Sequence, residues 1–209
     1  MTMRTKRIVA VAICVLVILA FCFHYSGLSR LFLEFSGYLE ARLRLAACQG
    51  ETKRVEQLLW FGVKVNATND EGGSALMHVE ACKGDVVTTR VDLIELLIAN
   101  GADVNLRNSE GKTALMYAAR NGDARAVTAL LKGGAQVNIA DNNGESAVMK
   151  AATSACNEET VRALLSAGAD LNARDKKGRN ALDSFRASYA CPESRVGYVL
   201  QEAVSGKGG

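Results

Sequence analysis

Two short glycine-led signatures recur along this chain in one register, and this repetition constrains the fold more than any other feature. The first signature has Gly three residues before Ala, and its copies begin at Gly72, Gly111, Gly144 and Gly178. The second has Gly four residues before Asn, and its copies begin at Gly62, Gly101, Gly134 and Gly168. Successive copies of both signatures are 39, 33 and 34 residues apart. Two independent signatures with the same spacing indicate tandem structural units.

A single unit, residues 110–142, predicts two short helices followed by a polar loop. The first helix is expected to present a face of small residues, formed by Ala114, Leu115, Ala118 and Ala119. The second helix is expected to present an apolar side, formed by Val127, Leu130 and Leu131. Gly134 follows the second helix, where a left-handed backbone favours glycine. Because one unit cannot bury its apolar face alone, its stability is expected to come from stacking on like units.

At these motifs the sequence resembles the ankyrin-repeat family. Thr113–Ala119 (TALMYAA) and Ser74–His78 (SALMH) resemble the family motif Thr-Pro-Leu-His-x-Ala, and Gly101–Asn105 matches its Gly-Ala-Asp-Val-Asn turn. The sequence departs from the family because Ala replaces Pro in every repeat, and Tyr117 and Lys150 replace the motif His. The resemblance covers about residues 39–203. It implies an all-α repeat solenoid of helix-turn-helix repeats with β-hairpin-like fingers, in which three full repeats lie between two degenerate caps.

The resemblance also implies a protein-binding surface at the hairpin tips and at the inner end of each first helix. The family motif places these partner-binding residues there: Asp70, Glu71, Ser109, Glu110, Lys112, Arg120, Asn121, Asn142, Asn143, Glu145, Lys176, Lys177 and Arg179. Gly73, Thr153 and Ser154 occupy equivalent positions. The tips change from acidic in the second repeat to basic in the fifth. We therefore expect a partner with a matching charge gradient, against the alternative of ordinary solvated tips.

The N-terminal residues predict a membrane anchor. Ile8–Phe23 is a run of sixteen uncharged residues, and a helix extended through residue 28 approaches the thickness of a bilayer core. Three basic residues precede the run: Arg4, Lys6 and Arg7. They predict a cytoplasmic tail at residues 1–7, an anchor at 8–28 and repeats on the extracytoplasmic side, which is the periplasm in a bacterium. A cleaved signal peptide and a buried helix are the alternatives.

Two further segments flank the repeats. Residues 29–38 are expected to form an amphipathic linker helix, because Leu31, Phe32 and Phe35 recur at helical spacing. This linker either caps the repeats or lies on lipid. Residues 204–209 are expected to form a flexible tail.

Charge and motif content argue against nucleic-acid binding and against catalysis. The formal net charge is +3, and the three basic residues before the apolar run account for it, so the rest of the chain is neutral. Gly111–Thr113 resembles the end of a phosphate loop, but Leu106 stands where that loop needs another Gly. His24 and His78 are the only histidines, and the resemblance assigns His78 to bracing its hairpin. No enzyme activity, cofactor or small-molecule substrate is therefore expected.

Four cysteines fall at equivalent places in adjacent repeats: Cys48, Cys82, Cys156 and Cys191. Packed helices lie about 8–10 Å apart, which is wider than the about 7 Å that a disulfide allows. The second repeat has six extra residues and the fourth has one, which gives the chain slack. We hypothesise two disulfides, Cys48–Cys82 and Cys156–Cys191, in an oxidising compartment, with four free thiols as the alternative. A metal site is not expected because no two of these cysteines are close in sequence.

The sequence thus predicts a membrane-anchored protein–protein interaction module on the extracytoplasmic side. The alternative is an immunity or inhibitor protein that neutralises a periplasmic toxin or enzyme. Asn66-Ala67-Thr68 is formally a glycosylation sequon, but Asn66 is the turn Asn of its repeat and is expected to bind backbone groups.

Overall fold

The computed structural model describes residues 28–82, 87–155, 157–188 and 195–205. The chain divides into two compact units, Met1–Leu39 and Glu40–Gly209. In the first unit the described part is the start of helix α2 (Leu28–Cys48), which continues into the second unit. The linker predicted at 29–38 is therefore helical, and the same helix extends into the predicted N-terminal cap.

The predicted membrane anchor, residues 8–28, lies outside the described residues except for Leu28. Within the described ranges, no helix is both long and apolar enough to cross a bilayer. The last helix ends at Val204, and residues 206–209 of the predicted C-terminal tail lie outside these ranges.

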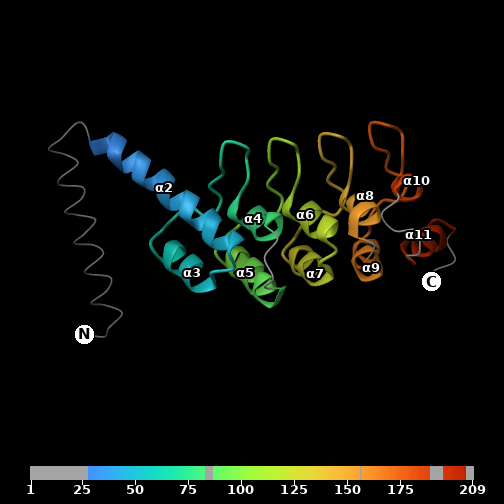
Figure 1. Cartoon of the computed structure of the whole chain (residues 1–209), viewed down its shortest axis with the longest axis horizontal. Coiled ribbons are helices and arrows are strands. Elements are labelled where there is room, and N and C mark those ends of the chain that lie inside the picture. The colour runs from blue at the N-terminus through green and yellow to red at the C-terminus, as the bar shows by residue number, and fades with distance from the viewer. Residues whose placement is uncertain (1–27, 83–86, 156, 189–194, 206–209) are drawn as a thin grey trace. The chain divides into compact units, whose positions relative to one another are not determined.

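The second unit consists of pairs of short helices joined by long loops (Figure 1). After α2 comes α3 (Thr52–Trp60), and the next pairs are α4 (Ala75–Ala81) with α5 (Val87–Ala99) and α6 (Ala114–Asn121) with α7 (Ala124–Lys132). They are followed by α8 (Ala147–Lys150) and the π-helix η1 (Ala151–Ala155) with α9 (Glu158–Ser166), and by α10 (Ala181–Ala187) with α11 (Val196–Val204). The described residues contain helices and no strand, as an all-α repeat fold requires. The hairpin-like character of the loops is limited to isolated bridges, which join Thr68 to Ser74 and Ala140 to Ser146.

The first helices of the pairs lie in one row and the second helices in another, and the long loops project from the row of first helices (Figure 1). Small residues allow this close stacking. Ala114, Ala118 and Ala119 are at most 1% exposed, because α6 packs between α4 on one side and α8 with η1 on the other. In the second row, Val127 and Leu130 are fully buried where α7 lies between α5 and α9. Each repeat therefore covers the apolar face of its neighbours.

Polar caps and glycines set the ends of these helices. The Asp123 side chain accepts a hydrogen bond from Ala126 N at 3.0 Å at the start of α7, and Asn157 does the same for Thr160 N at 3.1 Å at the start of α9. Gly134, which follows α7, has φ +93°, so the left-handed backbone predicted there is confirmed.

The extra residue of the fourth repeat is absorbed by η1. In the third repeat, nine positions separate the first residue of α6, Ala114, from the cap of α7, Asp123; in the fourth, ten separate Ala147 from Asn157. A π-turn holds one residue more than a hydrogen-bonded α-helical turn, so it can take up a single inserted residue. The fourth repeat therefore keeps the stacking of its neighbours despite the insertion.

A disulfide links the first two repeats. Cys48 ends α2 and Cys82 follows α4, and their Cα atoms are 5.3 Å apart in the Cys48–Cys82 disulfide. This is the pairing expected from the spacing. The Cα–Cα distance is shorter than the ordinary distance between the axes of packed helices. Cys156 and Cys191, the second expected pair, lie outside the described residues.

The core next to this disulfide contains an acidic residue. Glu80, in α4, is 1% exposed, and Asn121 at the end of α6 donates hydrogen bonds to its backbone carbonyl at 2.6 Å and to its Oε2 at 3.4 Å. Burial, with a smaller contribution from the Asp123 carboxylate, raises the pKa of Glu80 to about 7, against the opposing effects of Arg90 and Asn121. Glu80 therefore titrates near neutrality.

Candidate interaction surface

Each long loop is closed by the side chain of one residue near its start. These residues are Asn69, Asn108, Asp141 and Asp175. In each of them Oδ1 accepts hydrogen bonds from the backbone N–H groups two and four residues later, at 2.6 to 3.2 Å. Since Asn and Asp share this acceptor atom, either residue can close the loop. The loops that carry the predicted binding surface are thus fixed from within.

In the third and fourth repeats, the other polar atom of this side chain contacts the residue nine positions later. In the third repeat Asn108 Nδ2 donates to the Tyr117 hydroxyl at 3.2 Å. In the fourth repeat Asp141 Oδ2 lies 2.8 Å from Lys150 Nζ. The neutral loop residue has a neutral partner and the charged one has a cation. Tyr117 and Lys150 therefore brace their loops through different chemistry. The His of the motif Thr-Pro-Leu-His-x-Ala aligns with Met116 and Met149, so the expectation that Tyr117 and Lys150 replace it is wrong.

In the second repeat His78 occupies the same position and has a structural role. Its Nδ1–H donates to the Ser74 carbonyl at 2.8 Å. Its ring lies beside Gly73, where an added Cβ would be 2.8 Å from His78 Cε1 and 3.0 Å from Asn69 Oδ1. Gly73 is buried between these two side chains, so the prediction that it lies on the contact surface is wrong.

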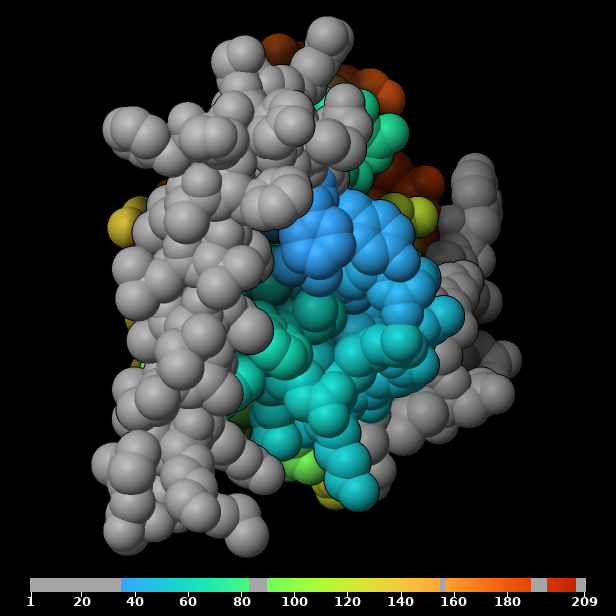
Figure 2. All heavy atoms as spheres, turned by 90° about the vertical axis from the view of Figure 1, so that its left-hand side faces the viewer, coloured from blue at the N-terminus to red at the C-terminus, as the bar shows by residue number. Residues whose placement is uncertain are grey.

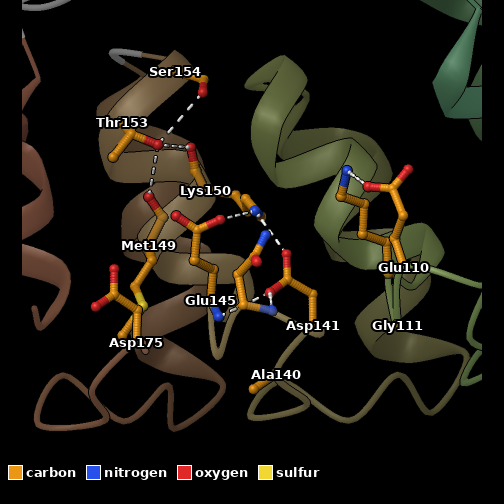
Figure 3. A network of polar contacts seen from close by, with 12 residues as sticks. Glu110, Gly111, Ala140, Asp141, Glu145, Met149, Lys150, Thr153, Ser154 and Asp175 are labelled. Carbon is orange, nitrogen blue, oxygen red and sulfur yellow. Dashed lines mark hydrogen bonds and ion pairs between the residues drawn. The ribbon is translucent and has the colours of Figure 1, made fainter. Parts of the chain in front are cut away.

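A polar network joins the loops of the fourth and fifth repeats, and Figure 3 shows its fourth-repeat part around Lys150. Lys150 Nζ pairs with the carboxylates of Asp141, whose side chain is buried, and of Glu145, whose side chain is partly exposed. Arg179 donates to Asp175 Oδ2 through Nε at 2.9 Å and Nη2 at 2.7 Å, and its Nη2 lies 3.8 Å from Glu145 Oε1. Glu145 thus connects the cation of one loop to the cation of the next.

The electrostatics of this network favour the ionised forms. Burial acts to raise the pKa of Asp141, but Lys150 and the backbone N–H groups of Glu145 and Asn143 outweigh it and hold this pKa below its usual value. Burial likewise acts to lower the pKa of Lys150, and the two carboxylates outweigh it and raise this pKa. Asp141 and Lys150 are therefore both charged at neutral pH.

A ladder of turn asparagines ties each repeat to the next. Its members are Asn66, Asn105 and Asn138. Each donates from Nδ2 to the carbonyl of the glycine that begins the next copy of the turn, at 3.0 to 3.1 Å, and accepts at Oδ1 from the N–H two residues beyond that glycine, at 2.8 Å. The expectation that Asn66 binds backbone groups is confirmed.

The loop tips are also joined to one another through their backbones. Three N–H groups donate to carbonyls of the preceding loop at 2.8 to 2.9 Å. These bonds run from Ser109, Asn142 and Lys176 to Glu71, Glu110 and Asn143, respectively. With the asparagine ladder, they hold the tips as one continuous rigid edge.

A hollow of about 210 Å³ opens between α6 and the α8–η1 helix, and we call it the α6–α8 hollow. Its lining residues are Lys112, Met116, Tyr117, Arg120, Glu145, Lys150, Thr153 and Ser154. Lys112 pairs with Glu110, and Lys150 pairs with Glu145. Arg120, by contrast, is exposed and makes no ion pair with any described residue.

The structure brings only some of the predicted contact residues into this hollow. Lys112, Arg120 and Glu145 line it, together with Thr153 and Ser154, which occupied equivalent motif positions. The other predicted residues that are exposed lie elsewhere, along the loops or at the end of α6: Asp70, Glu71, Ser109, Glu110, Asn121, Asn142, Asn143, Lys176 and Lys177. Arg179 is only partly exposed, because its guanidinium is engaged by Asp175 and Glu145.

These pairings alter the expected charge gradient. At the acidic end, Asp70 and Glu71 are exposed and make no ion pair within the described residues. At the basic end the same holds for Lys176 and Lys177, whereas Arg179 is neutralised locally. The gradient therefore has two free charges at each end.

Three lining residues were not predicted to contact a partner: Met116, Tyr117 and Lys150. Tyr117 and Lys150 brace their loops, and both residues also line the hollow. Met116 is 2% exposed and forms part of the floor. Helical spacing from Arg120 would have indicated it, since residues four apart lie on one helix face.

Comparison with known proteins agrees with this architecture. Residues 86–175 match the family model described as Ankyrin repeats (3 copies). A search of curated proteins found no match to the chain. Among the residues that the structure describes, no group of three or more potential metal ligands is gathered. This match supports a protein–protein interaction module.

Proposed function

We propose, on the basis of the ankyrin repeats, that this chain binds a protein partner by accepting one of its side chains in the α6–α8 hollow. The hollow is the observation that carries the proposal. Its volume of about 210 Å³ is smaller than the roughly 300–1,000 Å³ of ordinary small-molecule sites. It is large enough for one protruding side chain, and the rigid loop edge beside it provides further contact area.

The lining indicates the chemistry of the inserted side chain. Met116 forms an apolar floor, and the hydroxyls of Thr153 and Ser154 lie on one wall. Arg120 is the lining charge without an ion pair among the described residues. An acidic side chain of the partner would pair with Arg120 while its methylene groups cover Met116. A guanidinium and a carboxylate can form two parallel hydrogen bonds.

The free charges at the ends of the loop edge would orient the partner. Asp70 and Glu71 attract a basic region and Lys176 and Lys177 attract an acidic one, so a partner with the reverse order of charge docks in one direction. Such complementarity acts mainly on the association rate.

Membrane tethering on the extracytoplasmic side is the second part of the proposal. It is supported by the uncharged run Ile8–Phe23 with its basic N-terminal flank. The Cys48–Cys82 disulfide also supports it, because disulfides persist in oxidising compartments outside the cytoplasm. Tethering would restrict the module to partners at or near the membrane.

Site-specific photo-crosslinking tests the binding surface. A photoreactive residue in place of Ser154, on the wall of the hollow, is expected to capture the partner in intact cells, and Arg120→Ala in the same chain is expected to abolish the capture. The matched control is the same residue in place of Thr128, which is exposed on α7 in the other row of helices. Equal capture from both positions, or capture that survives Arg120→Ala, would contradict a partner seated in the hollow.

Fractionation tests the tether. The full chain is expected to stay in the membrane pellet after an alkaline wash, and protease added outside spheroplasts is expected to digest its repeats. Release by the wash would refute anchoring, and complete protection from external protease would refute the extracytoplasmic placement.

A further inference from the structure

The first repeat exposes two adjacent aromatic side chains. Trp60 ends α3 and Phe61 follows it, and these side chains are 59% and 68% exposed. Their rings meet edge to face, with centroids 5.1 Å apart and planes at 74°. Figure 2 looks onto the end of the second unit where α3 contributes to the surface, in cyan. The pair is therefore a preformed apolar patch with no cover among the described residues.

Comparison with the other repeats shows that the fold does not require this patch. The positions equivalent to Trp60 and Phe61, counted back from the turn glycine, hold small or polar residues in the next three repeats. These are Ala99 and Asn100, Lys132 and Gly133, and Ser166 and Ala167. The chain contains a single Trp, and it places that residue in water rather than in the core. An exposed apolar patch of this kind marks a contact with another surface.

The side chains around the pair are compatible with a phospholipid surface. Lys53 lies seven residues before Trp60 and therefore on the same face of α3, and Lys64 lies in the turn that follows Phe61. Both lysines are exposed and make no ion pair with any described residue. Glu56 is the acidic residue on this face. Trp with Lys nearby is a combination typical of membrane–water interfaces.

The length of chain before the first repeat identifies which surface is within reach. The predicted anchor ends where α2 begins, at Leu28, and the 21 residues of α2 span at most about 31 Å. The remaining repeats follow the first along the stack. If residues 8–28 cross a bilayer, the first repeat is the one that the chain holds nearest to it.

We propose that the Trp60–Phe61 pair docks on the phospholipid surface of the bilayer that the N-terminal segment enters. This inference rests on the proposed membrane tether. The indole and phenyl rings would lie at the level of the headgroups, where Lys53 and Lys64 pair with lipid phosphates. Docking at the first repeat would fix the stack at one end and leave the α6–α8 hollow open to a partner.

The single Trp makes the test direct. The full chain is reconstituted into vesicles of phosphatidylcholine and phosphatidylglycerol, and flotation of the vesicles reports whether it is anchored. Trp60 emission is expected at shorter wavelength than that of a water-exposed indole. It is also expected to be quenched more strongly by lipids brominated near the glycerol end of the acyl chain than by lipids brominated near the methyl end.

A matched control moves the reporter to the opposite end of the stack. Trp60→Phe with Tyr198→Trp keeps an aromatic residue at position 60 and places the only indole on α11, where Tyr198 is 62% exposed. This indole is expected to emit at long wavelength and to escape quenching. Phe61→Ser in the chain that retains Trp60 is expected to weaken the quenching, and circular dichroism checks that each variant is folded.

The outcomes separate this inference from the tether. A chain that floats with the vesicles but whose Trp60 is unquenched overturns the docking and leaves the tether standing. Short-wavelength emission without quenching also overturns it, because the pair is then covered by protein, such as the chain's own apolar segment. A chain that fails to float overturns the tether and the docking together. Quenching unchanged by Phe61→Ser overturns the pair as the docking unit.

Discussion

Replacing Lys150 with Met should destabilise the repeats strongly, because the two carboxylates beside it would lose their cation. The Asp141 side chain is fully buried and that of Glu145 is 24% exposed, and Lys150 pairs with both. In Lys150→Met the methionine retains most of the side-chain volume, so the change removes charge more than packing. The closely matched double variant Asp141→Asn/Lys150→Tyr gives the fourth repeat the neutral pair that Asn108 and Tyr117 form in the third.

The magnitude follows from burial. Removing one partner of a fully buried ion pair costs about 3–5 kcal/mol. The Lys150 side chain is 13% exposed, and Asp141 keeps its hydrogen bonds from the N–H groups of Asn143 and Glu145. We therefore expect a loss of about 3 kcal/mol, at the lower end of that range. The double variant leaves no uncompensated charge on Asp141 and should lie within about 1 kcal/mol of the original chain.

Urea unfolding of the chain in a mild detergent, followed by far-ultraviolet circular dichroism, measures both values. With a slope of about 1–3 kcal/mol per M, a loss of about 3 kcal/mol in the single variant should shift the midpoint by roughly 1–3 M. The folded-state pKa of Asp141 is depressed, so its contribution is present above the unfolded pKa of about 3.9 and is lost as pH falls through the folded value. The gap between Lys150→Met and the original chain should therefore narrow below about pH 4. A midpoint unchanged by Lys150→Met, or a double variant no more stable than the single one, would refute the charge-matching argument.

Three further changes test other parts of the structure. Glu80→Gln should raise the free energy of unfolding by at most about 3 kcal/mol above pH 7 and change it little below pH 4.5. The pKa of Glu80 is raised in the folded state, so its ionisation opposes folding as pH rises between those values, and urea midpoints measured across that range check the prediction. Asn138→Ala should lower the free energy of unfolding by about 1–3 kcal/mol, because it removes two hydrogen bonds to the next repeat. Asn172→Ala, at the turn position that ends the series, should change it by less than about 0.5 kcal/mol. Equal losses for the two variants in urea unfolding would argue against the asparagine ladder. Reduction of the Cys48–Cys82 disulfide, which closes a loop of 34 residues, should cost about 3–4 kcal/mol. The measurement is made in a Cys156→Ser/Cys191→Ser background, where adding Cys48→Ser/Cys82→Ser should make the urea midpoint the same with and without reductant.

Local pattern was enough to predict the repeat architecture. Glycine spacing located the turns that follow the second helices, including the left-handed residue Gly134, and the small face of Ala114, Ala118 and Ala119 predicted a closely stacked first helix. The backbone role of Asn66 also followed from its place in the turn. These features depend on backbone conformation and on burial within a repeating unit, so their periodicity is visible in the sequence.

The sequence could not determine which surface charges are free, because that depends on side chains from neighbouring repeats. Arg179 and Lys176 look equivalent in the sequence, but stacking places Asp175 and Glu145 around Arg179 and leaves Lys176 exposed. The α6–α8 hollow arises in the same way, between helices about 33 residues apart in the chain. Packing across repeats likewise brings Asn121 to the buried Glu80, whose pKa is raised. Periodicity fixes the backbone of each unit, whereas packing distances of a few ångströms between units decide charge, cavity and binding surface.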